Sequence, residues 1–149
     1  MTSHRIAVLG GSGFIGTQLV TQLLELGHEV KIYDLVQSTT FPELTTLGDV
    51  RDQDALRKAC EACDVIVNLA AAHRDDVRPI SLYHDDNVGG AEKTVAVAAE
   101  LGIKTIIFTS SVAIYGYTTK PLDETAPANP FNPYGQSKWD AEVVLRGWQ

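Results

Sequence analysis

The stretch Gly10-Gly11-Ser12-Gly13-Phe14-Ile15-Gly16 decides the fold of this chain. It follows the apolar run Ile6-Ala7-Val8-Leu9, which predicts a buried strand, and it opens into apolar residues at helical spacing. A strand, a glycine turn and a helix in this order are typical of a dinucleotide-binding unit, although a glycine turn without a ligand is the alternative. The glycines permit a tight turn and a close approach of the backbone to a pyrophosphate, whose charge faces the first helical amides.

The composition is that of an ordinary globular protein. The 149 residues amount to one domain, with 44% hydrophobic and 21% charged residues. A formal net charge of -7 argues against a surface that follows the phosphates of a nucleic acid. The sequence shows neither a signal-peptide pattern nor an apolar run of the ~20 residues that cross a bilayer. We therefore expect a cytoplasmic protein without a membrane or nucleic-acid partner.

Strands and helices alternate along the rest of the chain, which predicts an α/β fold with a doubly wound parallel sheet in the order 3-2-1-4-5. The sequence predicts strands over residues 6–9, 30–33, 45–47, 65–67 and 105–108. It predicts helices that begin after the glycine turn and over residues 53–62, 81–101 and 134–145. Asp52 is expected to cap the second helix, and Asn132-Pro133 to begin the last one. We see no internal domain boundary.

Asp34 ends the second predicted strand, 18 positions after Gly16. A carboxylate about 20 residues beyond the glycine turn binds the ribose hydroxyls of a dinucleotide. The next residues, Leu35 and Val36, supply no arginine for a 2′-phosphate, which the carboxylate would also repel. The sequence therefore favours NAD over NADP.

Two further groups of residues raise the question of a redox or metal site, which the surrounding sequence does not support. Cys60 and Cys63 fall at the end of a predicted helix and lack partners for a zinc site, so we expect two reduced, partly buried thiols. The charged loop over residues 72–80 holds His73 beside Asp75 and Asp76, without the other features of a metal site. We expect no metal, and regard Arg74 or Arg78 as candidates for contact with an anionic substrate.

Tyr134 and Lys138 lie four residues apart on the last predicted helix and therefore share a face. A free tyrosine has a pKa near 10 and is a poor base at neutral pH. A nearby lysine cation and the positive end of a helix both favour the phenolate, which makes Tyr134 a credible acid or base for a hydroxyl under oxidation. Ser111, at the end of the fifth strand, could hydrogen-bond to the same oxygen.

Taken together, these motifs make the chain resemble the N-terminal part of an extended short-chain dehydrogenase/reductase of the NAD-dependent epimerase/dehydratase type. The matching stretches are residues 10–16, Asp34, Gly48-Asp49-Val50, Asn68-Leu69-Ala70-Ala71, Asn87-Val88, Ser110-Ser111 with Tyr115-Gly116, and Pro133-Tyr134-Gly135-Gln136-Ser137-Lys138.

The resemblance assigns roles to these residues. It implies an NAD site and a catalytic set of Ser111, Tyr134, Lys138 and Asn87. Asn87 would support the lysine through backbone and water contacts, and Lys138 would also bind the nicotinamide ribose. The implied cofactor-binding residues are Gly10, Gly11, Gly13, Phe14, Ile15, Gly16, Asp34, Asp49, Val50, Leu69, Ala70, Ala71, Tyr134 and Lys138, with Asp49 and Val50 at the adenine.

The residues after Ser111 narrow the expected activity. Relatives that eliminate water or decarboxylate carry an acidic residue there, whereas this chain has Val112-Ala113. The resemblance thus implies a sugar-nucleotide epimerase, in which Tyr134 takes the sugar hydroxyl proton while NAD takes and returns a hydride. The alternatives are another NAD-dependent dehydrogenase, reductase or dehydratase, and an NAD-binding module without turnover.

Members of the family are about twice as long, so we expect a truncated chain that lacks further strands and a C-terminal substrate domain and is not competent in catalysis by itself. The fifth strand would then be an open edge, with Ile106, Ile107 and Phe108 available for pairing with another chain. The helices around residues 81–101 and 134–146 resemble those that form a four-helix dimer interface in this family. Both features lead us to expect a homodimer.

Overall fold

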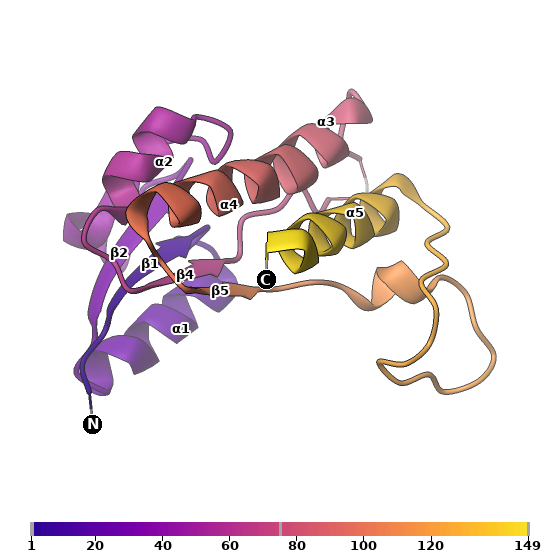
Figure 1. Ribbon diagram of the computed structural model, residues 1–149, viewed down its shortest axis with the longest axis horizontal. Coiled ribbons are helices and arrows are strands. Elements are labelled where there is room, and N and C mark those ends of the chain that lie inside the picture. The colour runs from indigo at the N-terminus through magenta and orange to yellow at the C-terminus, as the bar shows by residue number, and fades with distance from the viewer. Residues whose placement is uncertain (1, 75, 149) are drawn as a thin grey trace. The chain divides into compact units, whose positions relative to one another are not determined.

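The computed structural model describes residues 2–74 and 76–148 and contains one parallel sheet. The sheet has five strands in the order β3-β2-β1-β4-β5, which confirms the predicted topology (Figure 1). The strands are β1 (Arg5–Leu9), β2 (Glu29–Asp34), β3 (Thr45–Leu47), β4 (Val65–Asn68) and β5 (Thr105–Phe108).

Helices lie between the strands and after β5. The α-helices are α1 (Phe14–Glu25), α2 (Gln53–Cys60), α3 (Ser81–His84), α4 (Gly90–Leu101) and α5 (Pro133–Trp148). Two 3-10 turns, η1 (Pro42–Leu44) and η3 (Val112–Tyr115), and a π-helical turn, η2 (Asp85–Gly89), complete the set. None of these helices is both long enough and apolar enough to span a membrane.

The chain forms two compact units. The first consists of the chain up to Ala70 together with Lys93–Thr109, and it contains the whole sheet. The second consists of Ala71–Glu92 and the chain from Ser110 onward. The glycine turn therefore belongs to the first unit, and the tyrosine and lysine on α5 belong to the second.

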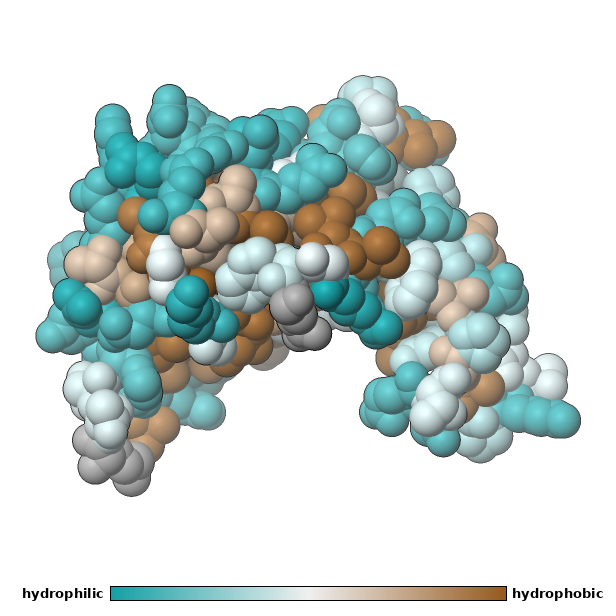
Figure 2. Space-filling view, viewed as in Figure 1, coloured by the Kyte–Doolittle hydropathy of each residue, from teal (hydrophilic) through white to brown (hydrophobic). Residues whose placement is uncertain are grey.

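The core of the first unit lies between the sheet and its helices. Ile6 and Val8 of β1 form a buried cluster with Val20 of α1 and with residues of β2 and β4. Figure 1 shows α1 on one face of the sheet and α2 on the other, where Leu56 is buried. The outer surface of α2 is hydrophilic in Figure 2. Because helices cover both faces of β1, this strand is apolar from Ile6 to Leu9 rather than alternating.

Two helices differ from the predicted ones. The second was expected to reach Ala62, but α2 ends at Cys60 because Ala62 adopts a left-handed backbone conformation with φ of 62°. The helix expected over residues 81–101 is interrupted at Asp85–Gly89, where the hydrogen bonding changes to the π type. Periodicity alone cannot reveal such a turn, since one extra residue shifts the pattern without breaking it.

Both cysteines are free and buried, as the sequence analysis expected of reduced thiols. Cys60 is fully buried at the end of α2, and burial raises its pKa to about 12. Burial also raises the pKa of Cys63. A thiol that stays protonated is a poor nucleophile, so the pair has the properties of core residues rather than of a redox centre.

A pair of glycine substitutions tests how tightly the turn after β1 is packed. Gly10 and Gly27 both have a positive φ, of 77° and 82°. A Cβ at Gly10 would lie 2.7 Å from the Ala70 nitrogen, whereas a Cβ at Gly27 would meet nothing within 4 Å. Gly27→Ala should therefore cost only the backbone strain, about 1–2 kcal/mol. Gly10→Ala should cost about 1–3 kcal/mol more, because the backbone of β4 has to move. Urea unfolding of both variants checks this, and equal losses would contradict the packing described here.

Candidate functional site

The glycine turn after β1 is held between the ends of β2 and β4. The Gly10 N–H donates a hydrogen bond to the Tyr33 carbonyl at 2.9 Å. A Cβ at Gly16 would lie 2.5 Å from the Gly11 carbonyl oxygen, so the first turn of α1 can pack here only without a side chain. The fold itself therefore accounts for Gly10 and Gly16.

Gly13 is different, because the fold leaves space beside it. A Cβ there would make an ordinary contact of 3.6 Å with the Gly10 carbonyl oxygen. Gly13 is the N-cap of α1, which has neither a side-chain cap nor an acidic residue in its first turn. By contrast, α2 begins with the Asp52 carboxylate accepting a hydrogen bond from the Ala55 N–H at 3.0 Å. The N-terminus of α1 can thus face an anionic group.

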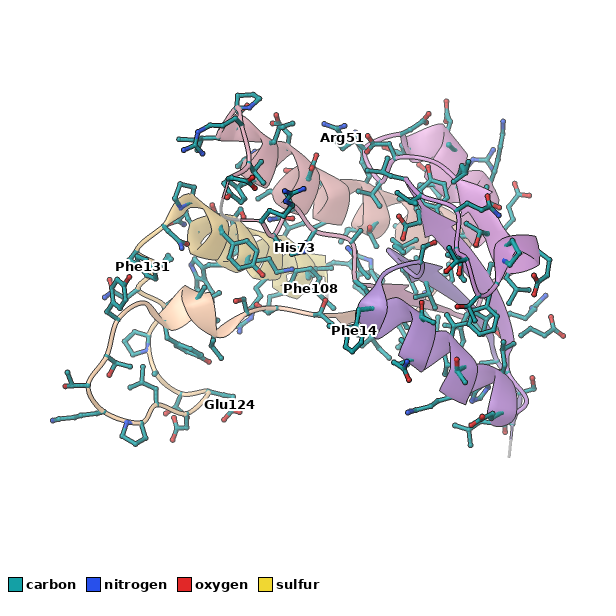
Figure 3. The ribbon with its side chains drawn as sticks, turned by 180° about the vertical axis from the view of Figure 1, so that it is seen from behind. Phe14, Arg51, His73, Phe108, Glu124 and Phe131 are labelled. Atoms are coloured by element: carbon teal, nitrogen blue, oxygen red, sulfur yellow. The ribbon has the colours of Figure 1, made fainter. Side chains whose placement is uncertain are left out.

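The side chains of the first turn of α1 do not cover this N-terminus. Phe14 is 86% exposed and Ile15 is 61% exposed, and Figure 3 shows Phe14 projecting from the end of the helix. These two expected cofactor-binding residues are therefore open to a ligand.

Asp34 lies at the end of β2 and accepts a hydrogen bond from the glycine turn. Its Oδ2 accepts a hydrogen bond from the Ser12 N–H at 2.9 Å, and its Oδ1 accepts one from the Val36 N–H at 3.2 Å. Each carboxylate oxygen can accept a further bond, so these contacts leave Asp34 able to bind hydroxyl groups. The Ser12 hydroxyl oxygen is buried and has no hydrogen-bond partner among the described residues.

Asp49, in the turn between β3 and α2, is paired with an arginine that the sequence analysis did not consider. The Arg51 Nε lies 2.9 and 3.0 Å from the two carboxylate oxygens of Asp49. These bonds hold the pKa of Asp49 below its usual range, and Figure 3 marks Arg51 beside α2. The Tyr33 hydroxyl donates to the Asp49 carbonyl at 2.9 Å, and the Tyr33 ring fills the space that a Cβ at Gly48 would need.

Most of the remaining residues expected at the cofactor directly follow β4. Buried Asn68 accepts a hydrogen bond from the Ala70 N–H at 3.1 Å through its side chain. The Leu69 N–H donates to the Leu9 carbonyl at 2.8 Å. Leu69, Ala70, Ala71 and Val50 are all partly exposed.

In the second unit, Asn87 joins three segments. This side chain lies in η2 and is buried, with 3% exposure. Its amide nitrogen donates to the Ala72 carbonyl at 3.1 Å and to the Ser137 hydroxyl at 2.8 Å, and its oxygen accepts from the Ala72 N–H at 2.9 Å. Ser137 directly precedes Lys138. The amide therefore fixes α5 against the loop that follows β4, which explains an asparagine where helix propensity is poor.

Tyr134 stands in the first turn of α5, whose start the sequence predicted. The Asn132 side chain accepts a hydrogen bond from the Gly135 N–H at 2.7 Å, as an N-cap does. The Tyr134 ring lies 6.3 Å from that of Tyr83, centroid to centroid. A Cβ at Gly135 would lie 2.5 Å from the Ala113 carbonyl oxygen, so η3 packs closely on this turn.

Ser111 caps η3 and therefore lies in the segment that packs against the first turn of α5. Its hydroxyl oxygen accepts a hydrogen bond from the Ala113 N–H at 3.1 Å, which leaves the hydroxyl proton available to a second oxygen. From η3 the chain continues into the exposed loop that carries Glu124 and Phe131 (Figure 3).

Lys138 is one of the largest fully buried side chains, with 1% exposure. Burial lowers its pKa to about 8, against the opposing effect of the Glu142 carboxylate one turn further along α5. Lys138 and Tyr134 lie four residues apart on α5 and therefore share a face of the helix.

The charged loop before α3 contains the residues of the metal hypothesis. Among the described residues, no group of three or more histidine, cysteine, aspartate or glutamate side chains could hold a metal ion. Asp75, one of the residues in the metal hypothesis, lies outside the described residues. Arg74 forms an exposed ion pair with Asp76 at 3.3 Å, and Arg78 donates to the Val77 carbonyl. Neither contact tests whether these arginines bind a substrate.

Comparison with known proteins gives consistent matches. Residues 6–149 match the NAD dependent epimerase/dehydratase family. The chain is 50% identical over 146 residues to the N-acetyl-alpha-D-glucosaminyl-diphospho-ditrans,octacis-undecaprenol 4-epimerase of Escherichia coli O157:H7, covering 98% of this chain and 44% of that protein. It is 36% identical to the UDP-glucose 4-epimerase of Lacticaseibacillus casei, covering 94% and 45% of the two chains.

A solved structure extends this similarity to three dimensions. The UDP-glucose 4-epimerase from Brucella ovis in complex with NAD matches with a TM-score of 0.89 and 30% identity, covering 98% of this chain and 48% of that one. The chain thus spans about half the length of the curated relatives and the solved structure that it matches.

The burial of Lys138 predicts a stability that depends on pH. The pKa of about 8 in the folded chain lies below the value near 10.4 of an unfolded lysine, so between these values the unfolded state binds more protons. The free-energy cost of burying the protonated Lys138 is therefore fully present below pH 8 and disappears as the pH rises toward 10. Lys138→Met should stabilise the chain by up to about 3 kcal/mol at pH 7 and have little effect at pH 10.

The measurement is the difference in unfolding free energy between variant and wild type at each pH, which cancels the titration of other groups. Lys120→Met, at an exposed position, gives the effect of the same exchange without burial. A Lys138→Met difference that stayed constant from pH 7 to pH 10 would contradict a lowered pKa.

Proposed function

Since the chain belongs to the NAD-dependent epimerase/dehydratase family, we propose that it is the NAD-binding and catalytic part of a sugar 4-epimerase. Its main support is the buried Lys138 one helical turn from Tyr134 on α5. A module that only bound a nucleotide would have no use for a cation buried at that position.

The residues of the first unit fit NAD. The uncapped N-terminus of α1 and the space beside Gly13 suit a pyrophosphate, which needs hydrogen-bond donors and a close approach to the backbone. Asp34 would hold the ribose hydroxyls of the adenosine. Asp49 and Val50 would meet the adenine, and Leu69, Ala70 and Ala71 would border the cofactor.

Cofactor preference follows from the charges at this end of the sheet. The Asp34 carboxylate repels a 2′-phosphate, and Arg51 is engaged in its ion pair with Asp49. Both features favour NAD over NADP.

Titration of the chain with both cofactors tests the preference. We expect NAD to bind at least tenfold more tightly than NADP, because the repulsion between the carboxylate and a 2′-phosphate should cost about 1.4 kcal/mol or more. Asp34→Ala should reduce the ratio of the two affinities, because it weakens the binding of NAD and removes the repulsion of the NADP 2′-phosphate. Asp76→Ala, which removes an exposed carboxylate of the second unit, serves as the control. Equal affinities of the wild type for the two cofactors would refute the assignment of Asp34.

The residues of the second unit would carry the proton chemistry. NAD, when bound, supplies a reversible hydride acceptor. The Tyr134 oxygen would take the proton of the sugar hydroxyl that is oxidised and return it when the ketone is reduced from the opposite face. Lys138 would stabilise the phenolate and bind the nicotinamide ribose, and the Ser111 hydroxyl would donate to the same sugar oxygen. Asn87 would act as a positioning residue for α5.

Two substrate classes are consistent with the relatives. Their names describe epimerases of UDP-glucose and of a lipid-linked N-acetylglucosaminyl diphosphate. Sugar nucleotides are the first candidate, in line with the sequence analysis. The 50% identity with the enzyme for the lipid-linked sugar is the specific observation that favours the second. In both classes a diphosphate is attached to the sugar.

Substitution of Tyr134 tests the mechanism. In the complete protein that carries this sequence, Tyr134→Phe should reduce epimerisation at least 100-fold, because it removes the acid–base group and leaves the ring. Substrates to compare are UDP-glucose, UDP-N-acetylglucosamine and undecaprenyl-diphospho-N-acetylglucosamine. Tyr83→Phe removes a neighbouring hydroxyl, which donates to the Arg74 carbonyl, and should leave turnover within a few fold. Unchanged turnover in Tyr134→Phe would rule out this mechanism, and no turnover of any substrate by the wild type would favour the binding module.

The domain arrangement and assembly of the protein belong to the same proposal. We expect residues 1–149 to act as one NAD-binding domain that works with a C-terminal substrate domain. We also expect a homodimer formed through the helices around residues 81–101 and 134–146, as the family resemblance implies.

A further inference from the structure

Ser137 is a buried polar residue within a helix, where alanine has the higher helix propensity. It lies on α5 between Tyr134 and Lys138, and its side chain is 3% exposed. Its hydroxyl makes two hydrogen bonds of 2.8 Å, since it accepts one from the Asn87 amide nitrogen and donates one to the Tyr134 carbonyl. This hydroxyl thus joins the π-helical turn η2 to the backbone of the tyrosine that would carry the proton chemistry.

The backbone fixes the direction of these bonds. The Ala72 N–H can only donate, so the Asn87 side-chain oxygen faces it, and the Asn87 nitrogen donates to the Ala72 carbonyl and to Ser137. Because the Ser137 oxygen accepts from that nitrogen, its own proton is left for the Tyr134 carbonyl. A chain of hydrogen bonds therefore runs from Ala72 through Asn87 and Ser137 to Tyr134. All four residues belong to the second unit.

The second partner of Ser137 distinguishes it from an ordinary helical serine. A serine or threonine hydroxyl that only bonds back to the preceding turn competes with the helix and slightly destabilises it. Removal of the Ser137 hydroxyl would in addition leave the buried amide of Asn87 with one donor unpaired, which is costly. The two bonds together therefore fix the first turn of α5 relative to the loop that follows β4.

The position of Tyr134 matters because a small displacement of an acid–base group slows the proton transfer. We propose that Ser137 is a positioning residue for Tyr134, whose hydroxyl holds the tyrosine backbone in a fixed place relative to Ala72 through Asn87. This inference rests on the proposed function and adds to it a residue to which the family resemblance assigned no role. Ser137 acts through the backbone of α5 and not on the substrate.

Substitution of Ser137 in the complete protein tests this role. Ser137→Ala should lower kcat for epimerisation about tenfold, because Tyr134 loses part of its restraint. The KM for the sugar substrate and the dissociation constant for NAD should change by no more than about twofold, since the lost interaction acts on the transition state. An unchanged kcat, or a higher KM with an unchanged kcat, would overturn the inference.

Ser137→Cys separates hydrogen bonding from packing. A thiol fills nearly the same space as the hydroxyl but is a weak hydrogen-bonding group, so this variant should lose nearly as much kcat as Ser137→Ala. Full activity in Ser137→Cys beside a loss in Ser137→Ala would show that only the volume of the side chain matters, and would overturn the inference.

A double-mutant cycle tests whether Asn87 and Ser137 act as a unit. Asn87→Ala already removes the chain of bonds, so adding Ser137→Ala should lower kcat by no more than about twofold further. Losses that multiply would show independent effects and overturn the inference. The free energies of unfolding of the same four proteins show the coupling without turnover, since the double variant should lose less than the sum of the single ones. If Asn87→Ala does not fold, the two Ser137 variants decide.

Thr21 on α1 provides a matched control, because its hydroxyl donates to the Thr17 carbonyl of its own helix at 2.9 Å. Thr21→Val keeps the shape of the side chain and should change kcat by no more than about twofold. A tenfold loss in this variant as well would overturn the assignment to Ser137. A wild type that turns over no substrate would instead contradict the proposed function and the catalytic role inferred from it, while the unfolding cycle decides separately whether Asn87 and Ser137 are coupled.

Discussion

The first unit depends on one constraint, the close contact between the Gly10 backbone and the backbone that directly follows β4. The turn receives support from both sides, because the Gly10 N–H bonds to the end of β2 while its Cα lies against Ala70. A side chain at Gly10 would separate β1 from its neighbour at the point where the sheet presents its carboxyl ends. The direction in which α1 leaves the sheet follows from this contact, and with it the orientation of the uncapped N-terminus of α1.

Much of the fold could be predicted because its signals are local. The β1 strand and the glycine turn lie within the twelve consecutive residues from Arg5 to Gly16. The caps at Asp52 and Asn132 were recognised from residue type and position. The order of the strands followed from the alternation of strands and helices. The glycine turn, Asp34, Ser111, Tyr134 and Lys138 were singled out by residue type and spacing, whereas the roles of Asn87, Asp49 and Val50 came from the family resemblance. The structure adds a physical reason for some of these residues, such as Gly16, which the packing of α1 requires.

What the sequence did not reveal depends on contacts between distant residues or on backbone detail. The three hydrogen bonds of Asn87 reach Ala72 and Ser137, 15 and 50 positions away. The Arg51–Asp49 pair is close in sequence, but only the geometry shows that the two side chains meet. That the Ser12 oxygen is buried without a partner is a property of the packed turn, which no residue pattern reports.

The π-helical turn at Asp85–Gly89 has a consequence for the comparison of related sequences. A π turn contains one residue more than the α-helical turn it replaces, so deletion of a single residue here would leave an uninterrupted α-helix. The helix would survive, but Asn87 would rotate by about 100° relative to the first turn of α4, the angle that one residue subtends. Homologues that differ by one residue in this segment would therefore align without difficulty while presenting a different side chain to Ser137. Gap placement at this turn thus decides which residues are compared as equivalent.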